Sequence, residues 1–186
     1  MNACQWPKNN PLMQKYHDIE WCVPSYDEKH LFEMLILEGA QAGLSWSIVL
    51  SKREEYKKAF CNFNIGYCAN LSEEDFQSIK EDYNVIKNTA KLKAVRSNAL
   101  AVQRIQGEFG SFSDYLWGYV DFNPQINYWA SEDEVPTQTR LSKQISDDLK
   151  KRGFKFVGPT IIYSFMQAIG MVDDHIKTCP YHSSNE

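Results

Sequence analysis

The chain has 186 residues, enough for one domain with a substantial core, and its composition is 43% hydrophobic and 24% charged. The formal net charge of −4 argues against a protein that coats nucleic acid through bulk charge, although it leaves room for a local basic patch. The start of the chain has no basic segment followed by an apolar run, and no apolar run is long enough to span a bilayer. We therefore expect a cytoplasmic protein without a membrane segment.

The cysteines and aromatic residues are the unusual parts of the composition. Five cysteines stand at irregular spacing without a CxxC pair: Cys4, Cys22, Cys61, Cys68 and Cys179. In a reducing compartment such cysteines are thiols or metal ligands and do not form a disulfide framework. Ten Tyr, ten Phe and five Trp leave aromatic side chains available for binding surfaces.

The first predicted elements are an irregular segment and a helix. Residues 1–27 contain three prolines and no sustained periodicity, so we expect them to be irregular. A helix is predicted over residues 27–43, opening near Asp27 and weakening or ending at Gly43. Its apolar positions follow the helical spacing i, i+3, i+4 in Leu31, Met34 and Leu35.

The rest of the chain predicts more helices. They cover residues 45–63, 71–80, 88–110, 112–120, 141–153 and 159–170. Ser45 is a candidate N-cap, and Ser72 followed by Asp75 resembles a capping box. Residues 121–140 are polar and contain two prolines, which predicts a surface loop. Almost nothing alternates with period two, so the predicted fold class is all-α, with no internal repeats.

Four residues from the two ends of the chain are candidate metal ligands. His175 and Cys179 stand at i and i+4, which would place them on one face of a short helix that Pro180 ends. Zinc prefers four nitrogen or sulfur ligands in a tetrahedron, and Cys4 and His17 would complete a Cys₂His₂ set. The alternative is a surface histidine and two unrelated thiols, and His182 is a spare candidate.

Glu38 and the segment after it are candidates for a binding site. Glu38 lies on the apolar stripe of the first predicted helix, so its carboxylate points toward the core. A buried carboxylate is costly unless it is paired, and a structural ion pair is as good an explanation as function. The next residues contain two glycines and then Leu44 and Trp46, a turn that could bring backbone and an apolar wedge close to a ligand.

Trp6, Tyr16 and Trp21 form an aromatic set in the segment expected to be irregular. They could fill the core beneath a long coil, which is common for tryptophan. They could instead form a stacking box for a flat ring, and a cationic ring would suit aromatic faces beside one carboxylate.

Residues 149–165 predict a helix, a tight turn and a second helix, with basic residues around the turn. The pattern resembles a helix-hairpin-helix, whose turn and helix N-terminus offer backbone N–H groups to a phosphate. The usual Gly–apolar–Gly turn is incomplete, because Phe156 stands at the first glycine and only Gly158 is kept. A solvated basic helix end is the competing interpretation.

These blocks together resemble one family, 3-methyladenine DNA glycosylase I, over nearly the whole chain and in the family's order. The matching blocks include "YHDIEW", "LFEMLILEGAQAGLSW", "KREEYKKAF", "GSFSDYLW" and "LKKRGFKFVGPTIIYSFMQAIGMVDDH". Only residues 121–140 match poorly. The resemblance implies an all-helical helix-hairpin-helix DNA glycosylase fold in a single unit over residues 1–186. It also implies that residues 1–27 and 171–186 together form a zinc-binding subdomain.

The resemblance also assigns site residues. A structural Zn²⁺ would join the termini through Cys4, His17, His175 and Cys179. The base pocket would consist of the catalytic Glu38 with Tyr16, Trp46, Trp6 and Trp21. The DNA-binding residues would be Gly43, Leu44, Lys151, Arg152, Phe156, Gly158 and Thr160. One departure is Cys22, which stands where the family usually has glycine and adds a side chain beside the pocket.

The implied activity is hydrolysis of the N-glycosidic bond of 3-methyladenine in double-stranded alkylated DNA, releasing the free base. The base would be flipped out of the duplex into the pocket. Methylation at N3 makes the base cationic and a good leaving group, and no lysine is placed to form a Schiff base. We therefore expect a monofunctional, monomeric glycosylase. Asp173 and Asp174 are expected to support the zinc ligand beside them rather than activate water. The alternatives are a glycosylase for another damaged base and a non-catalytic, zinc-clasped DNA-binding module.

Overall fold

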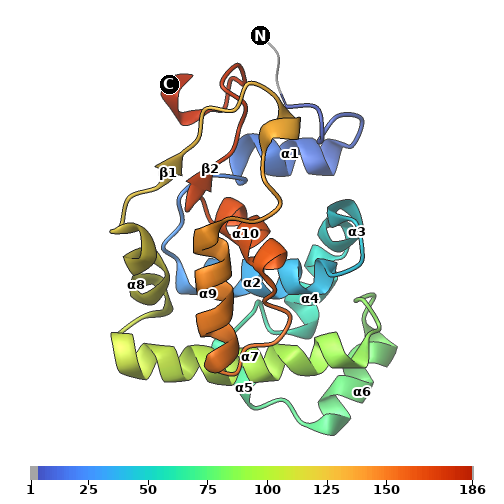
Figure 1. Cartoon of the computed structure of the whole chain (residues 1–186). Helices are drawn as coiled ribbons and strands as arrows, with labels where there is room; N and C mark the ends of the chain where they lie inside the picture. The colour runs from blue at the N-terminus through green and yellow to red at the C-terminus, as the bar shows by residue number, and fades with distance from the viewer. Residues whose placement is uncertain (1–3, 186) are drawn as a thin grey trace.

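The computed structural model describes residues 4–185 and consists almost entirely of helices (Figure 1). The central helix is α2 (Glu28–Gln41), and all its residues from 31 to 40 are buried. It packs against helices from both halves of the chain, which is typical of a core helix that is apolar all round. The Asp27 side chain caps its start by accepting a hydrogen bond from the His30 N–H. The predicted start of this helix is therefore confirmed.

The other helices pack against α2 or against the helices that contact it. They are α1 (Pro11–Ile19), α3 (Trp46–Ser51), α4 (Arg53–Ala59), α5 (Ile65–Ala69), α6 (Glu73–Asp82), α7 (Thr89–Phe109), α8 (Phe112–Trp117), α9 (Arg140–Lys151) and α10 (Pro159–Ala168), with short 3₁₀ turns η1 (Gly118–Val120), η2 (Glu132–Glu134) and η3 (Ser183–Asn185). The long helix α7 runs across one end of the molecule, and α1 lies at the other end with both chain termini (Figure 1). The predicted capping box at Ser72 and Asp75 is present at the start of α6.

Two predictions for the first third of the chain were wrong. The segment expected to be irregular contains α1, whose start is marked by the N-cap Asn10 and by Pro11 in the first turn. The single helix predicted over residues 45–63 is broken into α3 and α4 at Lys52, and Ser45 stands at the N-cap position without a side-chain hydrogen bond there. The chain then turns through left-handed backbone at residues 61–63 instead of continuing as a helix.

Residues 121–140 are not simply a surface loop. They contain the strand β1 (Gln125–Ile126), which pairs in parallel with β2 (Val172–Asp173). The Trp129 indole N–H donates to Asp174 Oδ1 at 2.7 Å, and the segment also contributes η2. This segment therefore joins the C-terminal part of the chain to the site described below.

Gly170 lets two distant segments meet closely at the end of α10. Its φ is +69°, and a Cβ there would lie 2.2 Å from the carbonyl carbon of Val23 and from the nitrogen of Pro24. A side chain would need both a strained backbone and a displaced neighbour. The glycine thereby fixes the end of α10 against the segment that follows α1. No helix of the described chain has the length and apolar character required to cross a membrane.

Candidate active site

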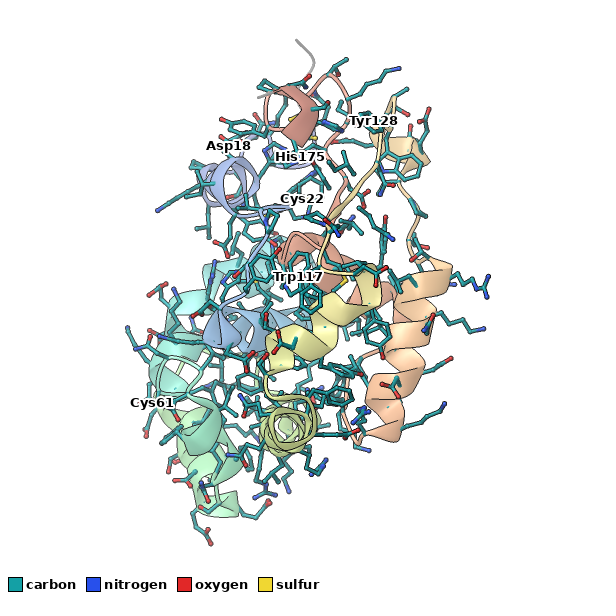
Figure 2. The ribbon with its side chains drawn as sticks, turned by 90° about the vertical axis from the view of Figure 1, so that its left-hand side faces the viewer. Asp18, Cys22, Cys61, Trp117, Tyr128 and His175 are labelled. Carbon is teal, nitrogen blue, oxygen red and sulfur yellow. The ribbon has the colours of Figure 1, made fainter. Side chains whose placement is uncertain are left out.

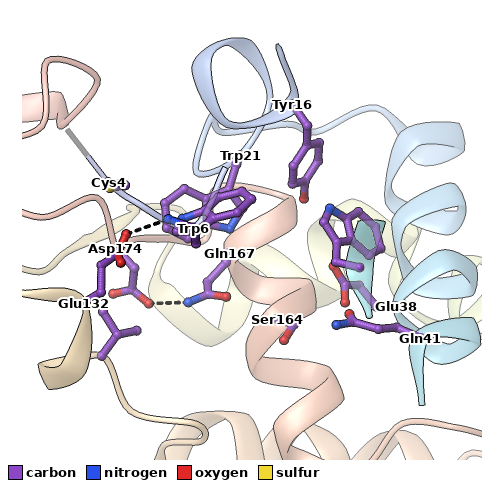
Figure 3. Close-up of a pocket in the computed structure, with 12 residues that line it drawn as sticks. Cys4, Trp6, Tyr16, Trp21, Glu38, Gln41, Glu132, Ser164, Gln167 and Asp174 are labelled. Atoms are coloured by element: carbon purple, nitrogen blue, oxygen red, sulfur yellow. Dashed lines mark hydrogen bonds between the residues drawn. The ribbon is translucent and has the colours of Figure 1, made fainter. Parts of the chain in front are cut away.

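A cavity of about 290 Å³ lies between α1, α2, α3 and α10 (Figure 3). The five residues that the sequence predicted for the base pocket all line it: Trp6, Tyr16, Trp21, Glu38 and Trp46. They come from the N-terminal segment, α1 and its end, α2 and the start of α3. The fold thus gathers these five side chains around one cavity, and α10 closes the opposite side.

The aromatic rings meet at an angle to one another. The rings of Trp6 and Trp21 lie 5.1 Å apart between centroids and are inclined by 72°. The rings of Tyr16 and Trp46 lie 5.2 Å apart with an angle of 53°. Because the rings do not stack in parallel on each other, they line the hollow without filling it, and flat faces remain available to a ligand.

Glu38 is a buried carboxylate without a partner. It is 4% exposed, and its Oε2 has no hydrogen-bond partner among the described residues. Burial raises the pKa of Glu38 to about 8. Glu33, five residues earlier in α2, is also buried, but the Arg53 Nε donates to it at 2.7 Å. The structural ion pair that could have explained a buried carboxylate in α2 therefore belongs to Glu33 and not to Glu38.

Two more polar atoms at the cavity lack partners. The Tyr16 hydroxyl and the Trp46 indole N–H are buried and make no hydrogen bond within the described chain. Burial, and then the charge of Glu38, raise the pKa of Tyr16, so it remains a neutral O–H donor. Two donors and one acceptor without partners around an aromatic-walled cavity indicate a binding site for a flat, polar ring.

A groove of about 200 Å³ continues from this cavity. It shares Glu38 with the cavity, together with Gln41 and Ser164, and is lined further along by Gly43, Leu44 and Thr160. Leu44 is 38% exposed. Three residues predicted to bind DNA therefore lie along one groove that leads into the predicted base pocket.

Lys91 of α7 holds the turn beside this groove. Its ammonium donates to the carbonyl oxygens of Ala40 and Ala42 at 2.8 and 2.6 Å. These carbonyls belong to the C-terminal end of α2, where a cation also interacts favourably with the helix dipole. Lys91 therefore anchors the start of the Gly43–Leu44 turn.

The turn between α9 and α10 is fixed from two sides. Asn98 of α7 accepts from the Lys155 N–H at 2.8 Å and donates to the Lys155 carbonyl at 3.1 Å. Ser146 of α9 donates to the Val157 carbonyl at 2.5 Å. Phe156 has φ +56°, the left-handed conformation that favours the glycine missing from the sequence pattern. Thr160 is exposed in the first turn of α10, whose free N–H groups suit a phosphate.

The two basic residues predicted to bind DNA differ in their surroundings. Lys151 is exposed at the end of α9. Arg152 donates to Glu108 at 2.7 Å and to Asp148 at 3.1 Å, and its guanidinium lies over the Phe109 ring. Arg152 is thus engaged within the protein, which weakens the prediction that it binds DNA.

The predicted metal ligands gather at the end of the molecule that holds both termini. The ligand atoms of Cys4, His17 and Cys179 lie within 4.8 Å of one another, and Cys179 Sγ is 3.8 Å from His17 Nε2. The His175 ring lies 4.7 Å from the His17 ring between centroids, and its buried Nε2 has no partner among the described residues. His175 and Cys179 lie in turns, so the predicted short helix was wrong.

Carboxylates orient both histidines toward this cluster. His17 Nδ1 is 2.7 Å from Asp18 Oδ1, and His175 Nδ1 is 2.8 Å from Asp173 Oδ1. A proton held on Nδ1 leaves Nε2 as a free ligand, as in histidine metal sites. Burial raises the pKa of the Cys4 thiol to about 12, so a thiolate there needs a cation. Figure 2 shows His175 and Asp18 together at this end.

Cys22 does not line the cavity. Its thiol is buried and accepts a hydrogen bond from the Asp174 N–H at 3.3 Å, behind the pocket wall. Its φ is +63°, a conformation that favours glycine. The side chain that Cys22 adds beside the pocket therefore contacts the lining residue Asp174 from behind and does not itself line the cavity.

Seven lining residues were not predicted as pocket residues: Cys4, Gln41, Glu132, Val135, Ser164, Gln167 and Asp174. Glu132 accepts from the Gln5 and Trp6 N–H groups at 2.5 and 3.2 Å and so holds the segment that carries Trp6. The bond from the Trp6 N–H joins residues that are 126 positions apart, and nothing local in the sequence indicates it. Ser164 and Gln167 could have been found from their spacing to Thr160 on one face of α10.

The class of protein follows from this arrangement. A helical fold with a lone carboxylate in an aromatic pocket, opening onto a helix N-terminus suited to phosphate, is typical of helical DNA glycosylases. The comparison with known proteins agrees. The chain belongs to the methyladenine glycosylase family, whose model matches residues 6–182.

The chain is similar over its full length to characterised members. It is 44% identical over 186 residues to DNA-3-methyladenine glycosylase 1 of Escherichia coli, covering 100% of both chains. A crystal structure of a 3-methyladenine DNA glycosylase I, 47% identical, superposes with a TM-score of 0.94 and covers 97% of this chain and 100% of that one. The Staphylococcus aureus enzyme, solved for its recognition of 3-methyladenine, is 37% identical with a TM-score of 0.95, covering 98% and 97%.

Proposed function

We propose that this protein is a DNA base-excision repair enzyme that hydrolyses the N-glycosidic bond of 3-methyladenine in alkylated DNA. The observation that carries the proposal is the unpaired Glu38 in an aromatic cavity, with two unpaired donors beside it. Such a site suits a flat, cationic base with hydrogen-bonding edges. The similarity to relatives that act on 3-methyladenine supports the same substrate for this chain.

In this mechanism the flipped base enters between Trp6, Tyr16 and Trp46. Glu38 accepts hydrogen bonds from the base edge, and its negative charge stabilises the positive ring. A cation in the cavity lowers the pKa of Glu38 from about 8, so binding and ionisation of the carboxylate favour each other. The methylated base leaves readily, so the protein mainly needs to extract and orient it.

The remaining chemistry requires neither a covalent intermediate nor a strong base. No lysine is among the residues that line the cavity in the described chain, which supports a monofunctional enzyme without strand cleavage. Asp174 lines the cavity, but both its oxygens already accept hydrogen bonds from protein donors. It is therefore poorly suited to activate water.

DNA binding is assigned to the groove beside the pocket and to the turn between α9 and α10, which we interpret as a helix-hairpin-helix. The backbone N–H groups at the start of α10, with Gly158 and Thr160, hold a phosphate. Leu44 fills the space left in double-stranded DNA when the base is extracted, and Gly43 allows the turn its φ of +75°. Lys151 adds positive charge.

A structural Zn²⁺ bound by Cys4, His17, His175 and Cys179 is also proposed. The geometry that supports it is the buried ligand cluster with its two carboxylate-oriented histidines. Four protein ligands leave no position for a catalytic water, so the metal stabilises a subdomain made of residues 1–27 and 171–186. Residues 1–3 and 186 of that subdomain lie outside the described part. We expect the single unit to act as a monomer in the cytoplasm.

The test of the function is a panel of duplexes that each carry one modified base. Bases from methylated, oxidised and mismatched DNA are separated by chromatography after incubation. Release of 3-methyladenine with intact strands supports the proposal. Release of a different base alone would indicate another glycosylase, and tight binding without release would indicate a non-catalytic DNA-binding module.

A further inference from the structure

Gln167 of α10 lines the cavity and is held by a single hydrogen bond. Its Nε2 donates to Asp174 Oδ2 at 2.8 Å. No other hydrogen bond within the described chain involves its side chain. Figure 3 shows the amide of Gln167 with its nitrogen toward Asp174 and its oxygen on the opposite side, away from Asp174.

Asp174 determines which way this amide faces. The carboxylate is 1% exposed and accepts hydrogen bonds on both oxygens. Asn127 and Trp129 donate to Oδ1, each at 2.7 Å. Tyr163 donates to Oδ2 at 2.7 Å, beside the bond from Gln167. Because a carboxylate only accepts, the glutamine must turn its NH₂ toward it and its carbonyl oxygen Oε1 toward the cavity.

We infer that Gln167 is a specificity-determining residue whose fixed oxygen accepts a hydrogen bond from the exocyclic amino group of the base. This inference rests on the proposed function. An adenine-type base presents an NH₂ group at its six position, whereas a base with an oxo group there presents only an acceptor. Two acceptors facing each other in a buried site repel and leave both without a partner. The pair Asp174–Gln167 therefore selects amino-bearing bases.

The substitution Asp174→Asn tests the orientation directly. The Trp129 indole can only donate, so the new amide must keep its oxygen at the Oδ1 position and place its NH₂ at the Oδ2 position. Tyr163 can accept from this NH₂, and Gln167 must reverse to accept as well. The reversed Gln167 presents its NH₂ to the cavity. A nearly isosteric change at Asp174 thereby converts the acceptor that Gln167 offers in the pocket into a donor.

The measurement is binding of free bases by isothermal titration calorimetry. The probes are 3-methyladenine and 3-methylhypoxanthine, which differ in the amino or oxo group at position six. We expect the wild type to prefer the amino base by roughly tenfold or more, and Asp174→Asn to reduce or invert the ratio. Gln167→Met, which removes the acceptor without touching Asp174, should bring the ratio close to one.

Asn127→Ala is the matched control. It removes a donor to Asp174 while leaving the orientation of Gln167 unchanged, so a purely structural role predicts that it behaves like Asp174→Asn. The inference requires Asn127→Ala to keep the wild-type ratio. The inference is overturned if the binding ratio of the two bases is unchanged in both Asp174→Asn and Gln167→Met. If Asp174→Asn does not fold, the ratio in Gln167→Met decides alone. A wild type that binds neither base would instead refute the proposed function.

Discussion

The substitution Glu38→Gln should make the protein more stable at alkaline pH while removing its central functional group. Glu38 is buried without a partner, so its ionised form is disfavoured in the folded state. Glutamine has the same shape and never carries the charge. We therefore expect the variant to lose the pH dependence that Glu38 imposes on the free energy of unfolding.

The size and sign of this pH dependence follow from the pKa of Glu38. It is about 8 in the folded protein, against 4.5 for the ordinary glutamate. Between these pH values the folded state holds a proton that the unfolded state has released, so the free energy of unfolding falls as pH rises through this window. At about 1.4 kcal/mol for each pH unit, the whole effect is on the order of 5 kcal/mol. It is absent below pH 4.5 and complete above pH 8.

The assay is urea unfolding of wild type and variant at several pH values from 5 to 9. The difference in unfolding free energy between the two proteins should grow with pH in favour of Glu38→Gln, by several kcal/mol. Glu33→Gln is the control in the same helix. It removes one of the two carboxylates that hold Arg53, since Glu20 remains, and should lower the free energy of unfolding by about 2 kcal/mol at pH 8. A difference between wild type and Glu38→Gln that stays constant with pH would refute the reasoning.

Three further perturbations address the zinc site, the DNA groove and the core. Cys179→Ser should remove the bound zinc, measured by elemental analysis, and lower the unfolding free energy by at least about 3 kcal/mol, because the site joins both termini. Leu44→Ala should reduce kcat/KM on duplex DNA by roughly tenfold or more, while binding of free 3-methyladenine in calorimetry stays unchanged. Gly170→Ala should destabilise the fold by about 4 kcal/mol or more, measured by thermal unfolding, because its Cβ overlaps the backbone at Val23.

Each of these variants has a matched control. Cys61→Ser changes an exposed cysteine, so it should keep zinc and stability. Ile48→Ala removes a similarly exposed side chain that does not line the groove, and DNA kinetics should not change. Gly107→Ala places a methyl group in open space within α7 and should be neutral or slightly stabilising. Equal effects in a variant and its control would contradict the role assigned to that position.

The sequence predicts the helices well where their apolar spacing and caps are strong. Asp27 and the pair Ser72 and Asp75 mark helix starts that the structure contains. The helix α1 was missed, although Leu12, Tyr16 and Ile19 recur at helical spacing and Asn10 followed by proline was a usable start signal. The break at Lys52 has no local signal and follows from packing.

For the site as well, local sequence predicts some features, whereas others depend on contacts between segments far apart in the chain. Glu38 could be selected because a charged residue on an apolar stripe conflicts with burial. Its lack of a partner could not be predicted, because the pairing of Arg53 with Glu33 depends on how α4 packs on α2. The same holds for Asp174, whose partners include Asn127 and Trp129 in a segment predicted to be a polar surface loop.

The most direct test of the whole account is release of free base from methylated duplex DNA by wild type and Glu38→Gln, measured by chromatography under single-turnover conditions. The wild type should release 3-methyladenine and leave abasic, uncleaved strands. The folded Glu38→Gln protein should release it at least about a hundredfold more slowly, because the charge that stabilises the cationic base is gone. Equal rates for the two proteins, or no 3-methyladenine released by the wild type, would contradict the account.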